Sequence, residues 1–186
     1  MAHKTKSCKY CKKRYPVSDG VQQPAGFFCD YDHAIKWAND KAEKARLLAQ
    51  AQDLKARKEK LKTRGDWLKE LQTIFNRFIR LRDQGQPCIS CQKVDNGSHQ
   101  RHASHYRSVG ANPELRFCEL NVWASCAQCN GMQSGNLINY RIALVNKLGN
   151  GKVEWLEGPH KPLKLTIDDI KLMKVVYKNK IKKYQE

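Results

Sequence analysis

The sequence predicts an α+β protein with a zinc-stabilised core, flanking helices, a long basic helix and a small N-terminal zinc-binding module. One observation behind this prediction is that cysteines recur in Cys-x-x-Cys pairs, a spacing typical of zinc ligands. Another is that long stretches without Pro or Gly carry apolar residues at helical spacing. A third is the formal net charge of +17, from 35 Lys and Arg against 18 Asp and Glu.

The charge indicates which class of partner the protein binds, and the cysteines indicate the redox state of its compartment. A pI near 9.6 indicates a positive potential suited to a phosphate backbone, although a basic ribosome-associated protein would share it. We find no signal-peptide pattern and no apolar run long enough to span a bilayer, so we expect no membrane partner. Without a secretory signal, paired cysteines favour metal binding in a reducing compartment over disulfides.

The central cysteines predict a structural zinc site. Cys88/Cys91 and Cys126/Cys129 can each supply two thiolates to one tetrahedral ion, with the two intervening residues forming a tight knuckle. A site assembled from pairs this far apart would clamp the ends of a hairpin and hold the residues between them.

Residues 1–33 contain a second candidate zinc set in the order Cys-x2-Cys…Cys-x3-His. Its members are Cys8, Cys11, Cys29 and His33. So short a segment could scarcely fold by apolar burial alone, so metal binding would contribute most of its stability. Asp30 or Asp32 could compete with His33, and a disordered basic tail with incidental cysteines is the alternative interpretation.

Residues 34–65 predict a basic helical arm. No Pro or Gly occurs before Gly65, and alanines and leucines recur at three-four and seven-residue spacings, as in a weak coiled-coil seam. Lys55, Arg57 and Lys58 on this helix are candidate DNA contacts. A solvated spacer is the alternative to a DNA-binding or dimerising role.

Residues 66–186 predict the main folded domain. An apolar stripe over 67–79 indicates a core helix, with Asp66 as its N-cap and Gly85 as its stop. The pattern predicts further helices over Leu137–Leu148, ending at Gly149, and after Thr166, where Asp169 three residues on indicates a cap.

Three polar residues near the central cysteines fit phosphodiester hydrolysis, which needs an activated water, a divalent cation and a fixed geometry between them. A histidine of near-neutral pKa can take a proton from water, so His105 is the candidate general base. Asn130, directly after Cys129, can offer a side-chain oxygen to a hard cation such as Mg²⁺. Asn121 can hydrogen-bond across the hairpin and hold the loop that carries the base.

The segments around these residues are SHYRS (104–108), LRF (115–117), Asn121, CAQCN (126–130), SGNL (134–137) and YR (140–141). They resemble those of the NinG, or Rap, recombination endonucleases of lambdoid phages, which are of the HNH, or ββα-metal, type. The resemblance is specific between residues 87 and 141 and loose elsewhere. It implies a phage-encoded endonuclease, dependent on Mg²⁺ or Mn²⁺, that cuts Holliday junctions and displacement loops in the cytoplasm of a bacterial host.

One position departs from the family pattern, in which an acidic residue commonly stands three places before the base. This chain has His102 there. Imidazole can ligate a divalent cation, so we expect His102 and Asn130 to hold the catalytic ion, with a preference shifted towards softer ions such as Mn²⁺. His99 is an alternative ligand, and either histidine could instead be a surface residue near DNA.

Other residues complete the hypothesis. Arg101, Arg107 and Arg116 are candidate phosphate contacts, although each could be only a surface charge, and Cys118 is expected to be a buried thiol. Two cuts on opposed strands favour a homodimer. The rival interpretations are a non-catalytic two-zinc module that binds DNA or RNA, and a sequence-specific HNH nuclease.

Overall fold

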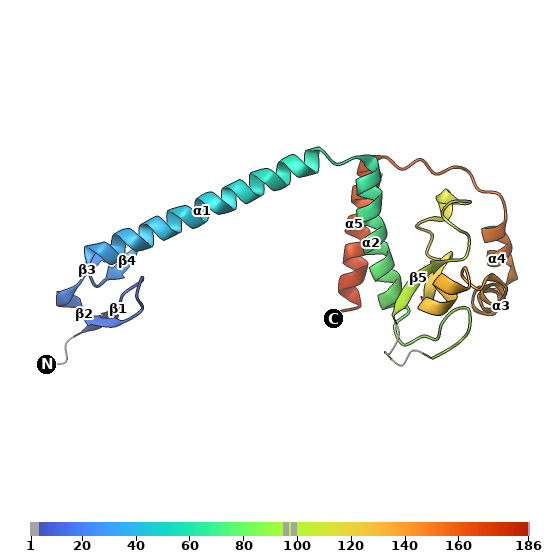
Figure 1. The fold of residues 1–186 in the computed structure, drawn as a ribbon, viewed down its shortest axis with the longest axis horizontal. Coiled ribbons are helices and arrows are strands. Elements are labelled where there is room, and N and C mark those ends of the chain that lie inside the picture. The colour runs from blue at the N-terminus through green and yellow to red at the C-terminus, as the bar shows by residue number, and fades with distance from the viewer. Residues whose placement is uncertain (1–3, 95–96, 98–99, 186) are drawn as a thin grey trace. The chain divides into compact units, whose positions relative to one another are not determined.

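The computed structural model describes residues 4–94, 97 and 100–185, and the chain forms two compact units, Met1–Leu61 and Lys62–Glu186. The elements of the N-terminal unit are β1 (Thr5–Ser7), β2 (Arg14–Pro16), η1 (Val17–Asp19), β3 (Val21–Gln23), β4 (Gly26–Phe28) and α1 (Tyr31–Lys60) (Figure 1). Strands β1 and β2 pair antiparallel, as do β3 and β4. Phe27 and Phe28 are buried, and the Phe28 ring lies 5.7 Å from that of Trp37, which gives the module a small apolar core.

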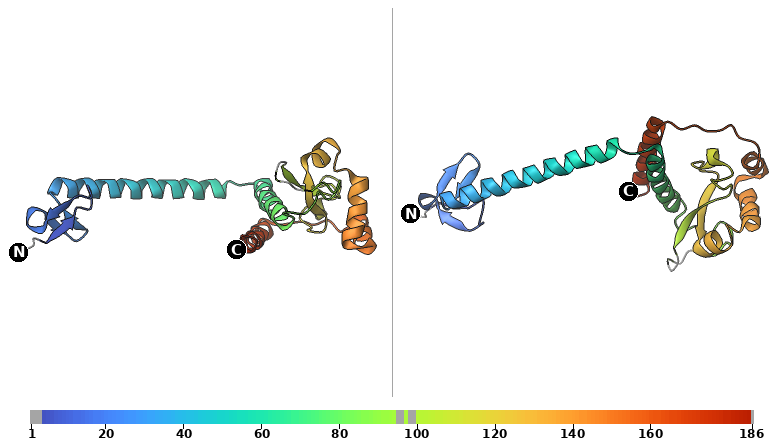
Figure 2. Two further views of the ribbon diagram at one scale, coloured as in Figure 1. Left: turned by 90° about the horizontal axis from the view of Figure 1, so that it is seen from below. Right: turned by 45° about the horizontal axis from the view of Figure 1, so that its top comes forward.

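Helix α1 is 30 residues long, about 45 Å at the rise of an α-helix, and runs without interruption (Figure 2). It begins earlier than predicted because Asp30 caps it, accepting a hydrogen bond from the His33 backbone N–H at 2.6 Å. None of its residues is buried. Its helicity therefore depends on local propensity and on pairs such as Lys36–Asp32, at 2.6 Å.

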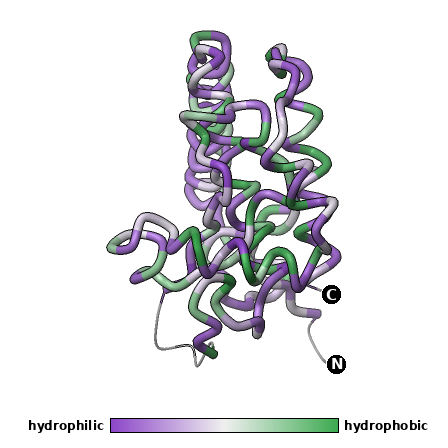
Figure 3. Tube along the Cα trace, turned by 90° about the vertical axis from the view of Figure 1, so that its right-hand side faces the viewer, coloured by the Kyte–Doolittle hydropathy of each residue, from purple (hydrophilic) through white to green (hydrophobic). Residues whose placement is uncertain are grey.

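The C-terminal unit consists of α2 (Arg64–Arg82), β5 (Arg101–His105), η2 (Pro113–Leu115), β6 (Val122–Cys126), the π-helical turn η3 (Gln128–Met132), α3 (Leu137–Leu148), α4 (Asn150–Glu157) and α5 (Ile167–Lys183). Helices α2 and α5 lie side by side (Figures 1 and 2). Apolar and hydrophilic residues alternate every few positions along the helices, as expected when one face is buried (Figure 3).

The antiparallel ribbon β5–β6 lies between two apolar clusters. Ala103 and Val122 belong to the cluster formed with α2 and α5, whereas Trp123 packs on the cluster of α3 and α4. Neighbouring side chains of a strand point to opposite faces of the ribbon. Alternate residues of each strand therefore contact different clusters. His105 pairs with Val122, and His102 pairs with Ser125 on the opposite face.

The prediction of Asp66 as N-cap is wrong. Thr63 caps α2, and Asp66 is the third helical residue, whose carboxylate accepts from the Thr63 backbone N–H at 3.0 Å. This reciprocal capping box keeps Gly65 in the first turn despite its weak helix propensity. The helix ends at Arg82, so Gly85 lies in the following turn, at φ +76°.

Helix α1 ends at Lys60, earlier than the predicted end before Gly65, because Thr63 already caps the next helix. Two other predicted helix boundaries are confirmed. Helix α3 ends where Gly149 adopts φ +85°, and Thr166 with Asp169 forms the capping box of α5. Helix α4 was not predicted. It starts directly after Gly149 and contributes the buried residues Val153 and Leu156 to the cluster around α3.

Candidate metal centres and catalytic residues

The four central cysteines come together as one cluster. The ligand atoms of Cys88, Cys91, Cys126 and Cys129 all lie within 4.8 Å of one another, and the sulfurs of Cys91 and Cys126 are 3.9 Å apart. Tetrahedral zinc–sulfur bonds of about 2.3 Å would separate neighbouring sulfurs by about 3.8 Å. The donor set and its spacing therefore fit a zinc ion that links the loop before β5 to the end of β6.

The N-terminal cluster contains Cys8, Cys11, Cys29 and His33, again within 4.8 Å. The Nδ1 atom of His33 lies 2.8 Å from the Cys29 sulfur and 4.0 Å from that of Cys8. Asp30 and Asp32 could compete with His33 as metal ligands, but they have other contacts. Asp30 caps α1, and Asp32 pairs with Lys36. Imidazole with three thiolates is a common zinc donor set, and these residues fit it.

The first knuckle of each cluster has the same backbone geometry. In both, the residue after the second cysteine is left-handed, with φ +65° at Lys12 and +56° at Gln92. The N–H of that residue donates to the carbonyl of the first cysteine, at 3.0 Å for Lys12 and 2.9 Å for Gln92. Non-glycine residues rarely adopt this conformation, so the knuckle itself holds them there.

Thiol pKa values in both clusters indicate sites for a cation. Burial opposes ionisation of Cys88, but backbone N–H groups of Cys91, Cys126 and Ser90 lower its pKa to about 7. Similar donors, against the same opposition from burial, lower the pKa of Cys8 to about 6. Burial and neighbouring sulfurs then raise the pKa of Cys129 to about 12. One thiolate disfavours the next, and a bound dication would remove that penalty.

His105 ends β5 and is half-buried. Its Nε2 lies 2.9 Å from the carbonyl oxygen of Arg116. Because a carbonyl only accepts, Nε2 carries the proton of the neutral ring and Nδ1 is left as an acceptor. Burial lowers the pKa of His105 below 6.5, with the Arg116 charge acting in the same direction. The ring is therefore neutral at pH 7, as a base must be.

Asn121 is fully buried between the two strands and fixes the loop after His105. Its side-chain oxygen accepts from the Arg107 backbone N–H at 2.8 Å, and its amide donates to the carbonyls of Arg107 and Leu115 at 3.0 and 3.2 Å. The predicted hydrogen bonding across the hairpin is present. Asn121 therefore holds the loop after His105 in position, and a catalytic role for it stays a prediction.

His102 and Asn130 lie together, as predicted for a shared cation. Asn130 Nδ2 and His102 Nδ1 are 3.1 Å apart. Ser125, opposite His102 in the ribbon, has a fully buried hydroxyl without a hydrogen-bond partner among the described residues. The contact brings together the two residues that were predicted to share a cation, and their binding of one stays a prediction. His99 lies outside the described residues.

Comparison with known proteins now identifies the family. A family model described as "Bacteriophage Lambda NinG protein" matches residues 1–186. The chain belongs to the NinG family. Protein ninG of Escherichia phage 933W is 35% identical over 95% of this chain and 92% of its own length. Protein ninG of Escherichia phage lambda is 43% identical over 69% of this chain and 62% of its own length. No solved structure matches the chain.

In this NinG-family chain, the three predicted phosphate-binding arginines have contacts within the protein. Arg116 Nε donates to Gln72 at 2.7 Å, and Arg107 Nε donates to Asn112 at 3.2 Å. Arg101 reaches the Lys93 carbonyl at 3.3 Å. All three remain half-exposed, so their role towards DNA stays a prediction.

Sequence reasoning missed residues that support the NinG-family site. The buried Tyr140 hydroxyl donates to the carbonyl of Ser104, the residue before His105, at 2.8 Å. Glu157 of α4 accepts from the Tyr106 hydroxyl and pairs with Arg141 at 2.7 Å. The motif at residues 140–141 was the available signal, but its partners depended on the unpredicted helix. Cys118 is half-buried and lies outside both clusters.

None of the helices in the described part of the NinG-family chain is long and apolar enough to cross a membrane.

Proposed function

We propose that this protein is an HNH-type, or ββα-metal, endonuclease that cuts branched DNA recombination intermediates, including Holliday junctions and displacement loops. The observation that supports it best is His105, whose Nε2 lies against the Arg116 carbonyl so that Nδ1 is left as an acceptor, three residues along β5 from the His102–Asn130 pair. A protein that only binds DNA has no need for this combination. Family membership supports a recombination role.

In the proposed reaction, His105 Nδ1 accepts a proton from a water that attacks phosphorus in line. His102 and Asn130 would hold Mg²⁺ or Mn²⁺, which would neutralise charge on the phosphoryl group and the leaving 3′ oxygen. Asn121 keeps the His105 loop in position throughout. The products would carry 5′-phosphate and 3′-hydroxyl ends.

The distance along β5 between His105 and the His102–Asn130 pair suits their proposed roles as base and cation ligands. Three residues of strand span about 10 Å, which leaves room for a water and a phosphoryl group between base and cation. Positions 102 and 105 point to opposite faces of the ribbon. One phosphate can be reached from both only at the outer edge of β5, which pairs with no strand other than β6 among those described. The scissile phosphate is therefore proposed to lie along that edge.

Charge supports DNA as the partner. The formal charge of +17 is shared by both units, since residues 1–61 carry 14 Lys and Arg against 7 Asp and Glu. Lys55, Arg57 and Lys58 are exposed on α1 and are proposed to contact phosphates, with Arg101, Arg107 and Arg116 nearer the cut. We further propose a homodimer acting in the cytoplasm of a phage-infected bacterium.

Cleavage of matched linear, forked and four-way DNA tests the proposal, with added Mg²⁺ or Mn²⁺ and with neither. We expect cuts at the branch that need the cation and that disappear in the variant His105→Ala. Tight junction binding without cleavage under every condition would instead support a two-zinc binding module. Equal cleavage of linear DNA at defined sequences would support a sequence-specific nuclease.

A further inference from the structure

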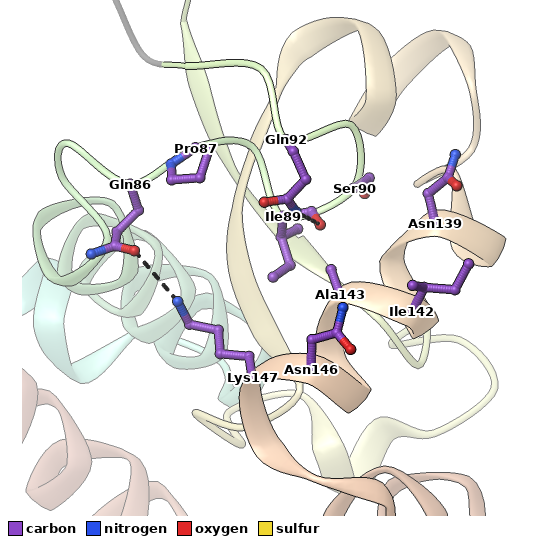
Figure 4. A pocket seen from close by; sticks show the side chains of 10 residues that line it. All are labelled: Gln86, Pro87, Ile89, Ser90, Gln92, Asn139, Ile142, Ala143, Asn146 and Lys147. Atoms are coloured by element: carbon purple, nitrogen blue, oxygen red, sulfur yellow. Dashed lines mark hydrogen bonds between the residues drawn. The ribbon is translucent and has the colours of Figure 1, made fainter.

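A pocket of about 490 Å³ lies between the first central knuckle and the exposed face of α3 (Figure 4). Its size falls within the range of about 300–1,000 Å³ that is usual for small-ligand sites. The residues of α3 that line it recur three or four positions apart, so they form one side of the helix. The proposed chemistry at His105 makes no use of this pocket.

The lining combines an apolar floor with a rim of amides. Ile89, Ile142 and Ala143 provide the floor. The amides are those of Gln86, Gln92, Asn139 and Asn146 (Figure 4). None of the described lining residues carries a carboxylate, and Lys147 adds an ammonium group. An anionic ligand with a flat, mostly apolar body and polar edges would match such a surface.

The pocket walls are fixed before any ligand binds. Lys147 Nζ lies 3.5 Å from the Gln86 side-chain oxygen and 4.8 Å from the centroid of the Trp123 ring. The Gln92 amide donates to the Ile89 carbonyl at 2.8 Å. Ser90 is buried and donates to the Gly135 carbonyl at 2.8 Å, which ties this wall to the loop after the second knuckle. These contacts join the pocket wall around the first knuckle to α3 and to the loop before it.

We propose that this pocket binds one unpaired nucleobase of the branched DNA, with the adjacent phosphate on Lys147. Amide side chains offer the donors and acceptors that base edges require, and the apolar floor would cover a ring that has left its stack. A fork or junction provides such bases at low cost because they are already unstacked. The inference rests on the proposed function in one respect, that DNA is the ligand.

Two isoleucines of α3 give a matched test. Ile142 lines the pocket and Ile138 does not, and both are exposed, by 56% and 80%. Ile142→Asp and Ile138→Asp change the net charge equally, so general electrostatic attraction falls equally in both variants. The probe is a DNA fork with one 2-aminopurine in its unpaired arm, and its affinity and fluorescence are measured without added Mg²⁺ or Mn²⁺. A fully paired duplex serves as the reference.

We expect Ile142→Asp to bind the fork about tenfold more weakly than Ile138→Asp and to lose the fluorescence change on binding. Affinities for the duplex should be equal. Equal fork affinities for the two variants would overturn the proposal. Should Ile142→Asp lose zinc, Asn146→Leu replaces it, since this exposed substitution keeps the size and removes the amide, and unchanged fork binding there would overturn the proposal as well.

These measurements do not depend on cleavage. A protein that cuts junctions but binds the fork equally in both variants would keep the nuclease and lose the pocket. Selective fork binding by a protein that never cuts would keep the pocket and remove the nuclease.

Discussion

At the scale of single residues, the imidazole of His105 is subject to two opposing influences. Burial and the Arg116 charge lower its pKa below 6.5, whereas the Arg116 carbonyl, 2.9 Å from Nε2, favours the protonated ring. The net effect is a pKa lowered from its ordinary value. The neutral form, which the proposed reaction requires, therefore predominates at pH 6.5 and is lost as the pH falls through the lowered pKa.

We expect His105→Ala to reduce junction cleavage by a factor of about 10² to 10⁴, the usual contribution of a general base. Zinc content and junction affinity should not change, because the base acts in the transition state. In the parent protein, cleavage should fall on acidification with a midpoint below pH 6.5. A midpoint above pH 7 would assign the titrating group to another residue.

The same shift predicts a stability effect. Since the folded pKa of His105 lies below the unfolded value, the unfolded chain binds the extra proton between the two, and stability rises with pH through that window. Acidification below pH 6.5 should therefore destabilise the protein less after His105→Gln than before.

Asn121→Ala should lower the free energy of unfolding by about 3 kcal/mol, because it leaves the Arg107 N–H and the Leu115 carbonyl unpaired in the interior. Denaturant unfolding measures this value. Asn150→Ala, at an exposed amide on α4, is the control and should change stability by less than about 0.5 kcal/mol. Equal effects of the two substitutions would remove Asn121 from its positioning role.

At the scale of elements, we expect the two central knuckles and the His102–Asn130 pair to have separate functions. Cys88→Ser should cost one zinc and at least about 3 kcal/mol of stability, since metal binding is coupled to folding. Cys118→Ser, outside both clusters, should keep both ions. Asn130→Ala should keep fold and zinc but lose cation-dependent cleavage. Elemental analysis and thermal unfolding distinguish these outcomes, and fewer than two zincs in folded parent protein would contradict the N-terminal site.

The elements also show which features a sequence can predict. The spacing of the ligands along the chain was sufficient to predict both clusters, because the two ligands of each knuckle are neighbours in the sequence. Helix starts were harder, since Thr63 and Asp66 are both good caps and only the backbone shows which one begins α2. The left-handed Lys12 and Gln92 could not be predicted, because a knuckle imposes that conformation on residues that do not prefer it. Helix α4 starts with a glycine in its first turn, which reads as a loop.

The residues of the candidate site also differ in whether the sequence predicts them. His105, Asn121 and Asn130 follow from their order between the cysteine pairs, and the structure gives each a defined set of partners. The position of Ser125 could not be predicted from the sequence. Its buried hydroxyl without a described partner, opposite His102, is seen only from burial and strand register.

At the scale of the whole molecule, the two units should contribute separately to DNA affinity. Removing residues 1–61 takes away a net charge of +7 but keeps Thr63, which caps α2, and Lys62, which pairs with Glu70 at 2.6 Å. We expect weaker junction binding with a shallower salt dependence, because fewer counterions are released, and residual cleavage at low salt. Replacing Lys55, Arg57 and Lys58 by glutamine should reproduce part of the loss. Unchanged affinity would show that the arm does not bind DNA.

The dimer also belongs to this scale. The stripe at residues 67–79 offers no seam, because Trp67, Leu71 and Phe75 are buried within their own unit. Leu47 and Leu54 on α1 are exposed by 53% and 54%, so we expect dimerisation through α1. Leu47→Glu with Leu54→Glu should give a monomer in sedimentation, whereas Gln52→Glu should not. One protomer per junction at saturation, with paired cuts still made, would exclude a functional dimer.

Helix α1 has no buried residue, and this has a consequence for how its sequence can change. Exposed helical positions away from caps usually accept substitution within about 0.5 kcal/mol, so the fold of the chain places almost no restriction on the middle of α1. Any intolerance found there by saturation mutagenesis would have to come from outside the chain. The helix would then report, position by position, where DNA or a second protomer touches it.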